Sequence, residues 1–348
     1  MIPDGGAGHS RVEQPILWLG MASFPAAQRV GLEALLTRSE ASPHWHPGPF
    51  GEADAWWVNG AKVRVLANGN LSVAPGLPTE HRLNLNLEDV DRPIAFAAPI
   101  PAGFEPRCAF DPDSKASVDA ALLQFDTWLR LLRSQFVLGK QLIERKQDLG
   151  RNVFHLTRQS SLLAVVDLHD RKVALAPAAH PSDLWQAHWH RRPAGARDTP
   201  CDFVSCTPSQ VAWTYVRRTQ RDMLPPHYRV EPVFYRRVPA VPVRWLHDSH
   251  LILLRELSAE PGTLESLAVR TGLTPKVLDM DLACLYYAGA VTTTRAKAAL
   301  PSAMRGTAGP RTGEPEPNAP ACHDRRQDLT APASLEHKQA RRDPDRTS

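Results

Sequence analysis

TGLTPKVLDMDLACLYYAGAV, residues 271–291, carries the clearest start and stop signals for a helix in this chain. Thr274 is a favoured N-cap residue type, and Pro275 follows it at the first helical position, where a missing N–H loses no bond. Gly289 supplies the left-handed residue that commonly closes a helix. The spacing therefore predicts a helix from Pro275 to about residue 288.

Two more helices are predicted upstream of this stretch. HLILLREL (250–257) has apolar residues at helical spacing, and Thr263 caps LESLAVR (264–270). The apolar positions expected to form one shared core are Leu254, Leu257, Leu264, Leu267, Leu273, Val277, Leu278, Leu282 and Leu285.

This segment of about fifty residues resembles a winged helix-turn-helix domain. Thr271-Gly272-Leu273 would be the turn, and AVTTTR (290–295) would enter the wing. The resemblance implies that the helix after the turn is the contact helix. The resemblance predicts a fold but not a particular function, because one fold serves many functions.

The chemistry of the expected contact helix argues against DNA. A helix in the major groove offers Arg, Lys, Asn or Gln to base edges and phosphates. Here the outward positions, Lys276, Asp279, Met280, Asp281, Ala283, Cys284, Tyr286 and Tyr287, hold one cation and two carboxylates, and the wing adds only Arg295 and Lys297. Carboxylates repel phosphates, so we predict a protein-contact face; the alternative is that these side chains pack on a neighbouring domain. The predicted face consists of Lys276, Asp279, Met280, Ala283, Tyr286 and Tyr287.

Short apolar runs closed by Gly or Pro recur in the first hundred residues. Such runs are typical of strands buried on both faces, and with intervening helices they predict a small α/β sheet. After the first run, Ser23 is expected to cap a helix with Val30, Ala34 and Leu35 on its apolar stripe. The runs are PILWLGM (15–21), GEADAWWVNG (51–60), LSVAP (71–75) and RPIAFAAP (92–99).

This order of strands resembles the receiver domain of bacterial response regulators, which implies a flavodoxin-like α/β fold. A working receiver needs an acidic pair after its first strand, an Asp ending its third, and a Lys near its last. Here the first strand ends in Gly20-Met21, the third ends in Asn59, and no Lys follows residues 92–99. The resemblance implies a pseudo-receiver with a degenerate phosphoacceptor position at Asn59; the alternative is an unrelated α/β domain.

The rest of the chain predicts an α+β region and terminal disorder. A long helix is expected from about Ser117 to Lys146, with a possible interruption at Gly139. Strands with turns at 159–161 and 169–171 follow, then helices at 182–190 and 207–222 and an extended run at 224–245. The predicted organisation is 1–13 disordered leader, 14–112 receiver-like α/β domain, 113–149 connecting helix, 150–246 α+β middle domain, 247–297 winged helix and 298–348 disordered tail.

A run of arginines and aromatic residues between 215 and 245 is the strongest polar candidate. Guanidinium groups and rings together suit phosphates and stacked bases. The alternative is that these arginines cover a connector and pair with local acids. The candidate anion-binding residues are Arg217, Arg218, Arg221, Arg229, Arg236, Arg237 and Arg244.

Composition and motifs exclude several other classes. The net charge of +4 is mild for 348 residues, and five scattered cysteines form no CxxC pair. His44, His46, His188 and His190 lack a third ligand at metal spacing, and no GxSxG, Walker, GxGxxG or HExxH motif occurs. The sequence contains no run of about 20 apolar residues, so we expect no membrane span. The N-terminal residues do not resemble a signal peptide. We expect no cofactor and no metal.

These observations predict a cytoplasmic, non-enzymatic regulatory or adaptor protein of bacterial type whose partner is another protein. The second hypothesis is a nucleic-acid or nucleotide binder, such as a transcription factor or a cyclic-dinucleotide effector, that uses the arginine run. An enzyme without a known motif is the third.

Overall fold

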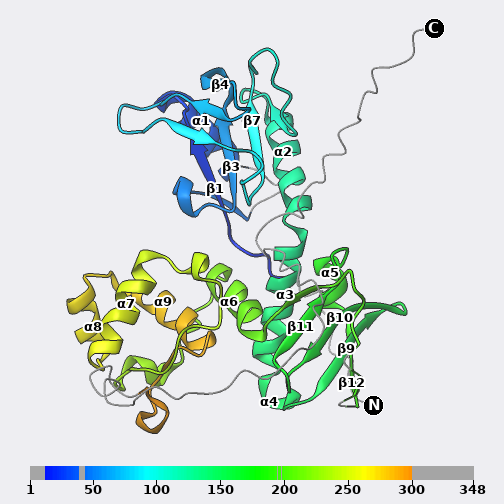
Figure 1. Ribbon diagram of the computed structural model, residues 1–348, viewed down its shortest axis with the longest axis vertical. Helices are drawn as coiled ribbons and strands as arrows, with labels where there is room; N and C mark the ends of the chain where they lie inside the picture. The colour runs from blue at the N-terminus through cyan, green and yellow to red at the C-terminus, as the bar shows by residue number, and fades with distance from the viewer. Residues whose placement is uncertain (1–11, 39–43, 194, 197, 300–348) are drawn as a thin grey trace, which may run out of the picture. The chain divides into compact units, whose positions relative to one another are not determined.

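The computed structural model describes residues 12–38, 44–193, 195–196 and 198–299, and the chain divides into two compact units (Figure 1). The N-terminal unit holds residues 18–38 and 47–129, and the C-terminal unit holds residues 12–17, 44–46 and the described residues from 130 to 299. The predicted leader up to residue 11 and the predicted tail from residue 300 lie outside the described residues. None of the described helices is long and apolar enough to cross a membrane.

The N-terminal unit is built on a five-stranded sheet with the order β2-β1-β3-β7-β8. The pairs β1–β3, β3–β7 and β7–β8 are parallel, which confirms the predicted α/β sheet. The runs at 15–21, 51–60 and 92–99 supply β1, β3 and β7. The strands are β1 (Leu17–Ala22), β2 (Trp45–Gly48), β3 (Ala55–Asn59), β7 (Ile94–Ala97) and β8 (Ala109–Phe110).

A small antiparallel sheet follows β3 where a doubly wound sheet would have a helix. It consists of β4 (Val63–Val65), β5 (Leu71–Val73) and β6 (Leu83–Leu85). The run at 71–75 therefore belongs to this second sheet. The two sheets share one buried cluster, formed by Ala22, Val58, Val63, Leu71, Val73, Leu85 and Phe96.

Helix α1 (Ala26–Thr37) connects β1 to β2 and buries a different stripe from the one predicted. Leu32 and Leu36, one turn apart, are each 1% exposed, whereas Val30 is 66% exposed. The stripe through Val30, Ala34 and Leu35 was wrong because the two larger leucines take the buried face, where they remove more apolar area from water.

The long helix predicted from 117 to 146 is divided into three. The segments are α2 (Lys115–Trp128), α3 (Arg130–Glu144) and α4 (Lys146–Leu149), and the compact units divide between Leu129 and Arg130. The considered interruption at Gly139 does not occur, because this glycine lies inside α3. A Cβ there would lie 2.3 Å from the carbonyl oxygen of Val211, so the glycine allows α3 to approach α6 closely.

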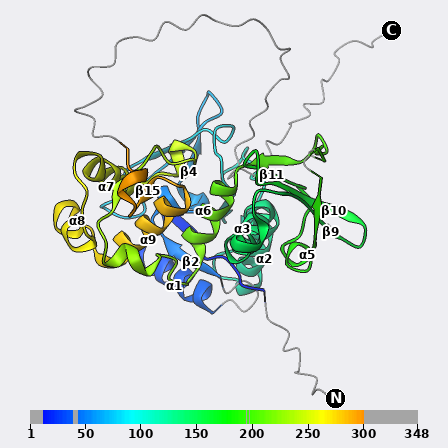
Figure 2. The same cartoon turned by 90° about the horizontal axis from the view of Figure 1, so that it is seen from below.

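In the C-terminal unit, α3 lies between α6 and an antiparallel sheet of order β12-β9-β10-β11-β13 (Figures 1 and 2). The predicted turns at 159–161 and 169–171 are confirmed as the β9–β10 and β10–β11 connections. Gln159 and Ser160 both have positive φ, as a type I′ hairpin turn requires. The strands are β9 (Val153–Arg158), β10 (Ser161–Asp167), β11 (Lys172–Leu175), β12 (His188–Arg192) and β13 (Val204–Cys206).

Of the two helices predicted over 182–190 and 207–222, the second is confirmed, although it ends at Arg218. α6 (Pro208–Arg218) begins with a capping box in which the Thr207 side chain accepts from the Gln210 backbone N–H. The helix expected over 182–190 was wrong. α5 is only Pro181–Trp185, and residues 188–192 form β12 because they pair with β9.

Three α-helices, a short strand and a 3-10 helix end the described chain. They are α7 (Asp248–Ala259), α8 (Leu264–Thr271), α9 (Pro275–Tyr287), β15 (Val291–Thr292) and η5 (Arg295–Lys297). Gly272 and Gly289 both have the left-handed φ that closes a helix. β15 pairs with β14 (Phe234–Tyr235), so the run at 224–245 is not extended throughout; it also contains the short 3-10 helices η3 (Pro226–Arg229) and η4 (Val243–Trp245).

Candidate functional site

The C-terminal half of α9 packs along α6 and is buried from Asp281 to Leu285. The expectation that Asp281, Ala283 and Cys284 point outward was therefore wrong, and Ala283 is 2% exposed. The three-helix segment alone would leave this face open, but α6 covers it. A helix packed in this way cannot place these positions in a DNA groove or against a partner.

The N-terminal half of α9 remains accessible but carries little positive charge. Lys276 is exposed in the first turn, and Met280 is half-buried. The Asp279 carboxylate lies 2.6 Å from Nη1 of Arg229, so an arginine of the predicted anion-binding run neutralises an acid of the predicted contact face. This pairing raises the pKa of Arg229.

The two tyrosines at the end of α9 are half-buried among other rings. Tyr286 and Tyr287 lie edge to face with ring centroids 4.8 Å apart, and Tyr286 also meets Tyr228 at 5.1 Å. Burial raises the pKa of Tyr287 to about 12. Of the six predicted contact residues, the structure places Lys276, Asp279 and Met280 on accessible turns, and Tyr286 and Tyr287 at the edge of the unit's own packing.

A buried polar cluster that sequence reasoning missed lies between α6, α7 and α9. His250 is 1% exposed, and its Nε2 lies 3.2 Å from Oδ1 of Asp281, which is 2% exposed. The His247 backbone N–H donates to Nδ1 of His250 at 3.1 Å. The imidazole of His250 also lies 5.0 Å from the ring of Trp213 on α6. The pattern of apolar and polar residues did not indicate this cluster, because His250 and Asp281 both resemble polar surface residues of amphipathic helices.

This geometry keeps the imidazole of His250 neutral. Because Nδ1 accepts a backbone N–H, it cannot carry a hydrogen, and the single hydrogen sits on Nε2 beside Asp281. Burial, followed by the nearby charges of His247 and Arg217, lowers the pKa of His250 to about 3. The neutral ring on α7 therefore contacts Trp213 of α6 and Asp281 of α9.

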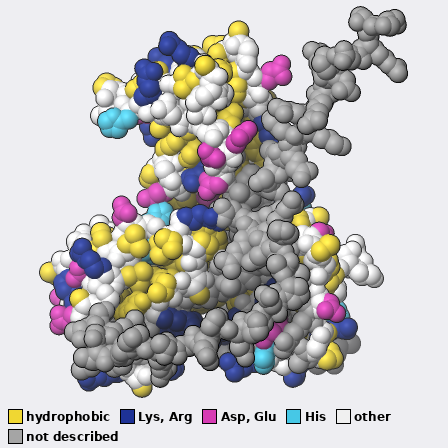
Figure 3. Space-filling view, in the orientation of Figure 1, with side chains coloured by type: hydrophobic (Ala, Val, Ile, Leu, Met, Phe, Trp, Pro, Cys, Tyr) yellow, Lys and Arg dark blue, Asp and Glu magenta, His cyan; other side chains and the backbone are white. Residues whose placement is uncertain are grey.

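Large aliphatic side chains are exposed on each of the three last helices. Val269 on α8 is 82% exposed, Leu251 on α7 is 47% exposed, and Val277 on α9 is 40% exposed. Val277 and Leu278 were both expected in the core, but only Leu278 is buried. Figure 3 shows hydrophobic side chains gathered over the region of α7 and α9 on one face of the protein.

The arginine run does not form one continuous surface. Arg221 pairs with Glu13 and Glu144, and Arg229 pairs with Asp222 and Asp279. Pairing with local acids was the alternative interpretation for these two arginines. The remaining five are placed separately: Arg217 near His247, Arg218 at the end of α6, Arg244 in η4, and Arg236 with Arg237 directly after β14.

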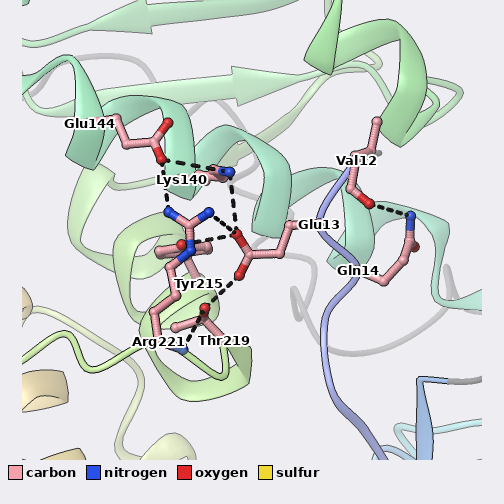
Figure 4. A network of polar contacts seen from close by, with 8 residues as sticks. All are labelled: Val12, Glu13, Gln14, Lys140, Glu144, Tyr215, Thr219 and Arg221. Atoms are coloured by element: carbon pink, nitrogen blue, oxygen red, sulfur yellow. Dashed lines mark hydrogen bonds and ion pairs between the residues drawn. The ribbon is translucent and has the colours of Figure 1, made fainter. Parts of the chain in front are cut away.

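Glu13, which was assigned to the disordered leader, contacts four side chains (Figure 4). One belongs to α3, one belongs to α6, and two belong to the turn after α6. Its Oε2 lies 3.3 Å from Nζ of Lys140, from Nη2 of Arg221 and from the hydroxyl of Tyr215. The Thr219 hydroxyl donates to Oε1 at 2.5 Å. The leader assignment was wrong at this position because one carboxylate satisfies two cations, one of them, Lys140, nearly buried.

Replacing Glu13 with glutamine is expected to destabilise the C-terminal unit by about 1.5 to 3 kcal/mol, the usual value of a hydrogen bond to a charged group. Glutamine retains the shape and the bonds to Thr219 and Tyr215 but leaves the Lys140 ammonium without its main counter-charge. Urea unfolding measures the change. Glu144→Gln is the matched control, because Glu144 meets the same cations from a side chain that is 47% exposed and should matter less. Equal effects of the two variants would contradict this account.

The carboxyl edge of the parallel sheet is the place where open α/β sheets bind ligands, at the point where strand order reverses, here between β1 and β3. Asn59 ends β3, and its side chain is used twice: Nδ2 donates to Ser23 O, and Oδ1 accepts from Ala61 N. Ser23 does not cap α1; it has a left-handed φ of 67° in the β1–α1 turn.

The chain's own loop fills this edge. Oε2 of Glu80 accepts from the backbone N–H groups of Ser23 and Gly76 at 3.2 and 2.9 Å. A Cβ on Gly76 would lie 2.2 Å from the carbonyl carbon of Ser23, so the loop is pressed against the β1–α1 turn. Glu80 thus supplies a carboxylate where a bound anion would meet these amides, a role that no sequence signal indicated.

Comparison with protein-family models, with curated proteins and with solved structures found no match to this chain. Among the residues that the structure describes, no group of three His, Cys, Asp or Glu side chains is arranged to hold a metal ion.

Proposed function

We propose that this protein is a non-enzymatic regulatory or adaptor protein that acts through protein–protein contacts of its last three helices. In this proposal, α7–α9 with β15 form a winged-helix module, and the N-terminal unit is a receiver-like domain that cannot be phosphorylated. The protein resides in the cytoplasm and needs no cofactor.

The observation that carries the proposal is the exposed aliphatic side chains on the three helices, together with the single cation of α9. Leu251, Val269 and Val277 expose aliphatic side chains there, and Lys276 is the lone lysine or arginine of α9. Exposed apolar groups favour another protein as the partner, whereas a polyanion needs a cluster of cations. The coverage of α9 by α6 supports the same choice.

The carboxyl edge of the parallel sheet supports the silent receiver. The strand order, with the second strand outside the first and the others in chain order, is that of flavodoxin-like sheets. At the phosphoacceptor position Asn59 has an amide in place of a carboxylate, and Glu80 occupies the neighbouring amides. No α-helix lies between β3 and β8, which departs from the receiver pattern.

The double variant Val269→Asp and Val277→Asp should abolish capture of the protein's partner in affinity purification from the source cells. Val30→Asp is the matched control, since Val30 is 66% exposed on α1 of the other unit and its replacement should leave capture intact. The fluorescence anisotropy of a labelled mixed-sequence duplex is measured in parallel at low salt. Retained capture by the double variant, or salt-dependent duplex binding that the variant weakens, would overturn the proposal.

A further inference from the structure

The small antiparallel sheet β4–β6 of the N-terminal unit has one apolar face and one polar face. Val63 and Val73 belong to the buried cluster that this sheet shares with the parallel sheet. Because successive side chains of a strand point to opposite faces, Arg64, Ser72 and Asn84 lie on the other face. The strand register places these three residues directly opposite one another, one on each strand.

Three cations flank the middle of this polar face. Arg64 stands opposite Ser72, and the backbone carbonyl of Lys62, two residues earlier, accepts the Ala74 N–H at 2.9 Å. Arg82 comes directly before β6, and its Nη1 lies 3.5 Å from Oγ of Ser72. The cations therefore stand on both outer sides of the sheet, and the side chains between them are the small ones of Ser72 and Ala74.

Local acids do not neutralise this face. Lys62, Arg64 and Arg82 are exposed, and in the part of the chain that the structure describes none of them forms an ion pair with a carboxylate. Glu80, two residues before Arg82, instead accepts backbone N–H groups of the β1–α1 turn and of its own loop. Among the described residues of the N-terminal unit, Asp and Glu outnumber Lys and Arg by twelve to eight. The three cations are therefore gathered on one face of an otherwise acidic unit.

We propose that this polar face, defined by Lys62, Arg64, Ser72 and Arg82, is a docking surface for a short acidic segment of another protein. An extended segment that lies over the small side chains of the central strand brings its carboxylates to the cations on both outer sides. Each guanidinium can bind one carboxylate through two parallel hydrogen bonds. The contact belongs to the N-terminal unit, so it does not rest on the function proposed above for the last three helices.

A nucleic acid fits this face less well than an acidic peptide does. The residues that define the face include no aromatic ring on which a base could stack. A duplex also extends beyond three cations and would meet the excess of carboxylates on the rest of the unit, which repel phosphates. A short acidic segment is small enough to meet the cations alone.

Fluorescence anisotropy of a labelled peptide of four Glu-Thr repeats, titrated with the full chain at low salt, tests the proposal. We expect saturable binding that a Gln-Thr peptide of the same length does not show. The double variant Arg64→Gln and Arg82→Gln should weaken this binding at least about fivefold, because two exposed charge pairs of modest strength are lost. Both side chains are exposed, so the variant should remain folded.

The double variant Arg38→Gln and Lys115→Gln is the matched control. It removes the same charge from exposed positions elsewhere in the N-terminal unit and should leave peptide binding unchanged. An oligothymidine of the same length is titrated in parallel. The proposal would be overturned by the absence of saturable peptide binding, or by equal weakening in the two double variants, which would mean that the peptide meets only the general charge. Tighter binding of the oligothymidine than of the peptide, lost in Arg64→Gln and Arg82→Gln, would also overturn it and would assign the face to nucleic acid.

Discussion

Gly139→Ala is expected to destabilise the C-terminal unit by about 2 to 3 kcal/mol, the upper range for overpacking a close contact. A Cβ at this position would lie 2.3 Å from the carbonyl oxygen of Val211 and 2.8 Å from Cβ of Tyr215. Because the nearer atom belongs to the backbone of α6, a side-chain rotation cannot relieve the clash, and α3 and α6 must separate. Native-state hydrogen exchange of amides in α3 measures the loss within this unit alone.

Gly31→Ala is the control for the preceding variant. Gly31 also lies inside a helix, α1, but no atom lies within 4 Å of the position that its Cβ would take. Alanine should therefore stabilise α1 by roughly 0.5 to 1 kcal/mol through its helix propensity. If Gly139→Ala were neutral or stabilising in the same way, the close approach of α3 and α6 would be refuted.

Acidification below pH 6.5 is expected to remove several kcal/mol of stability from the C-terminal unit through His250. In the unfolded chain this histidine takes up a proton near its ordinary pKa of 6.5, whereas the pKa in the folded protein is lowered to about 3. The unfolded state therefore binds more protons between these values, and stability, which is full above pH 6.5, falls as the pH decreases toward 3. The slope for one proton is at most about 1.4 kcal/mol per pH unit.

His250→Gln separates titration from packing. Glutamine at the third helical position accepts the N-cap backbone N–H as the Nδ1 of His250 does, so the capping box of α7 survives without a titrating group. We expect this variant to lose less stability between pH 6.5 and 4 than the unmodified chain in urea unfolding. His81→Gln, at an exposed position of the other unit, should leave the pH dependence unchanged. An identical pH profile for His250→Gln and the unmodified chain would contradict the assignment.

Local signals predicted much of the fold. Thr263 and Gly289 marked helix ends that the structure confirms, and three of the four apolar runs near the N-terminus form strands of the parallel sheet. These features depend on a few neighbouring residues, so the sequence displays them directly. Residues 188–192 show the opposite case. Their sequence is compatible with the end of a helix, but they form a strand because they pair with β9, about thirty residues earlier.

The candidate site was less predictable because its environment comes from distant segments. The cap residues at its two ends identified α9, yet they could not reveal that α6 would bury Ala283 or that His250 would meet Asp281. The sequence around Glu13 likewise gave no sign that this carboxylate would pair with Lys140 and Arg221. Each of these contacts joins residues more than thirty positions apart, and no local pattern specifies which charges are brought together.

The most direct test of the central claim, that the exposed face of the last three helices binds a protein, is photo-cross-linking from Val269 in the source cells. The side chain is replaced by benzoylphenylalanine, with the same replacement at Val30 as the control. The account predicts a discrete adduct from position 269 that resists nuclease and is digested by protease, and no such adduct from position 30. A nuclease-sensitive adduct from position 269, or the same adducts from both positions, would contradict it.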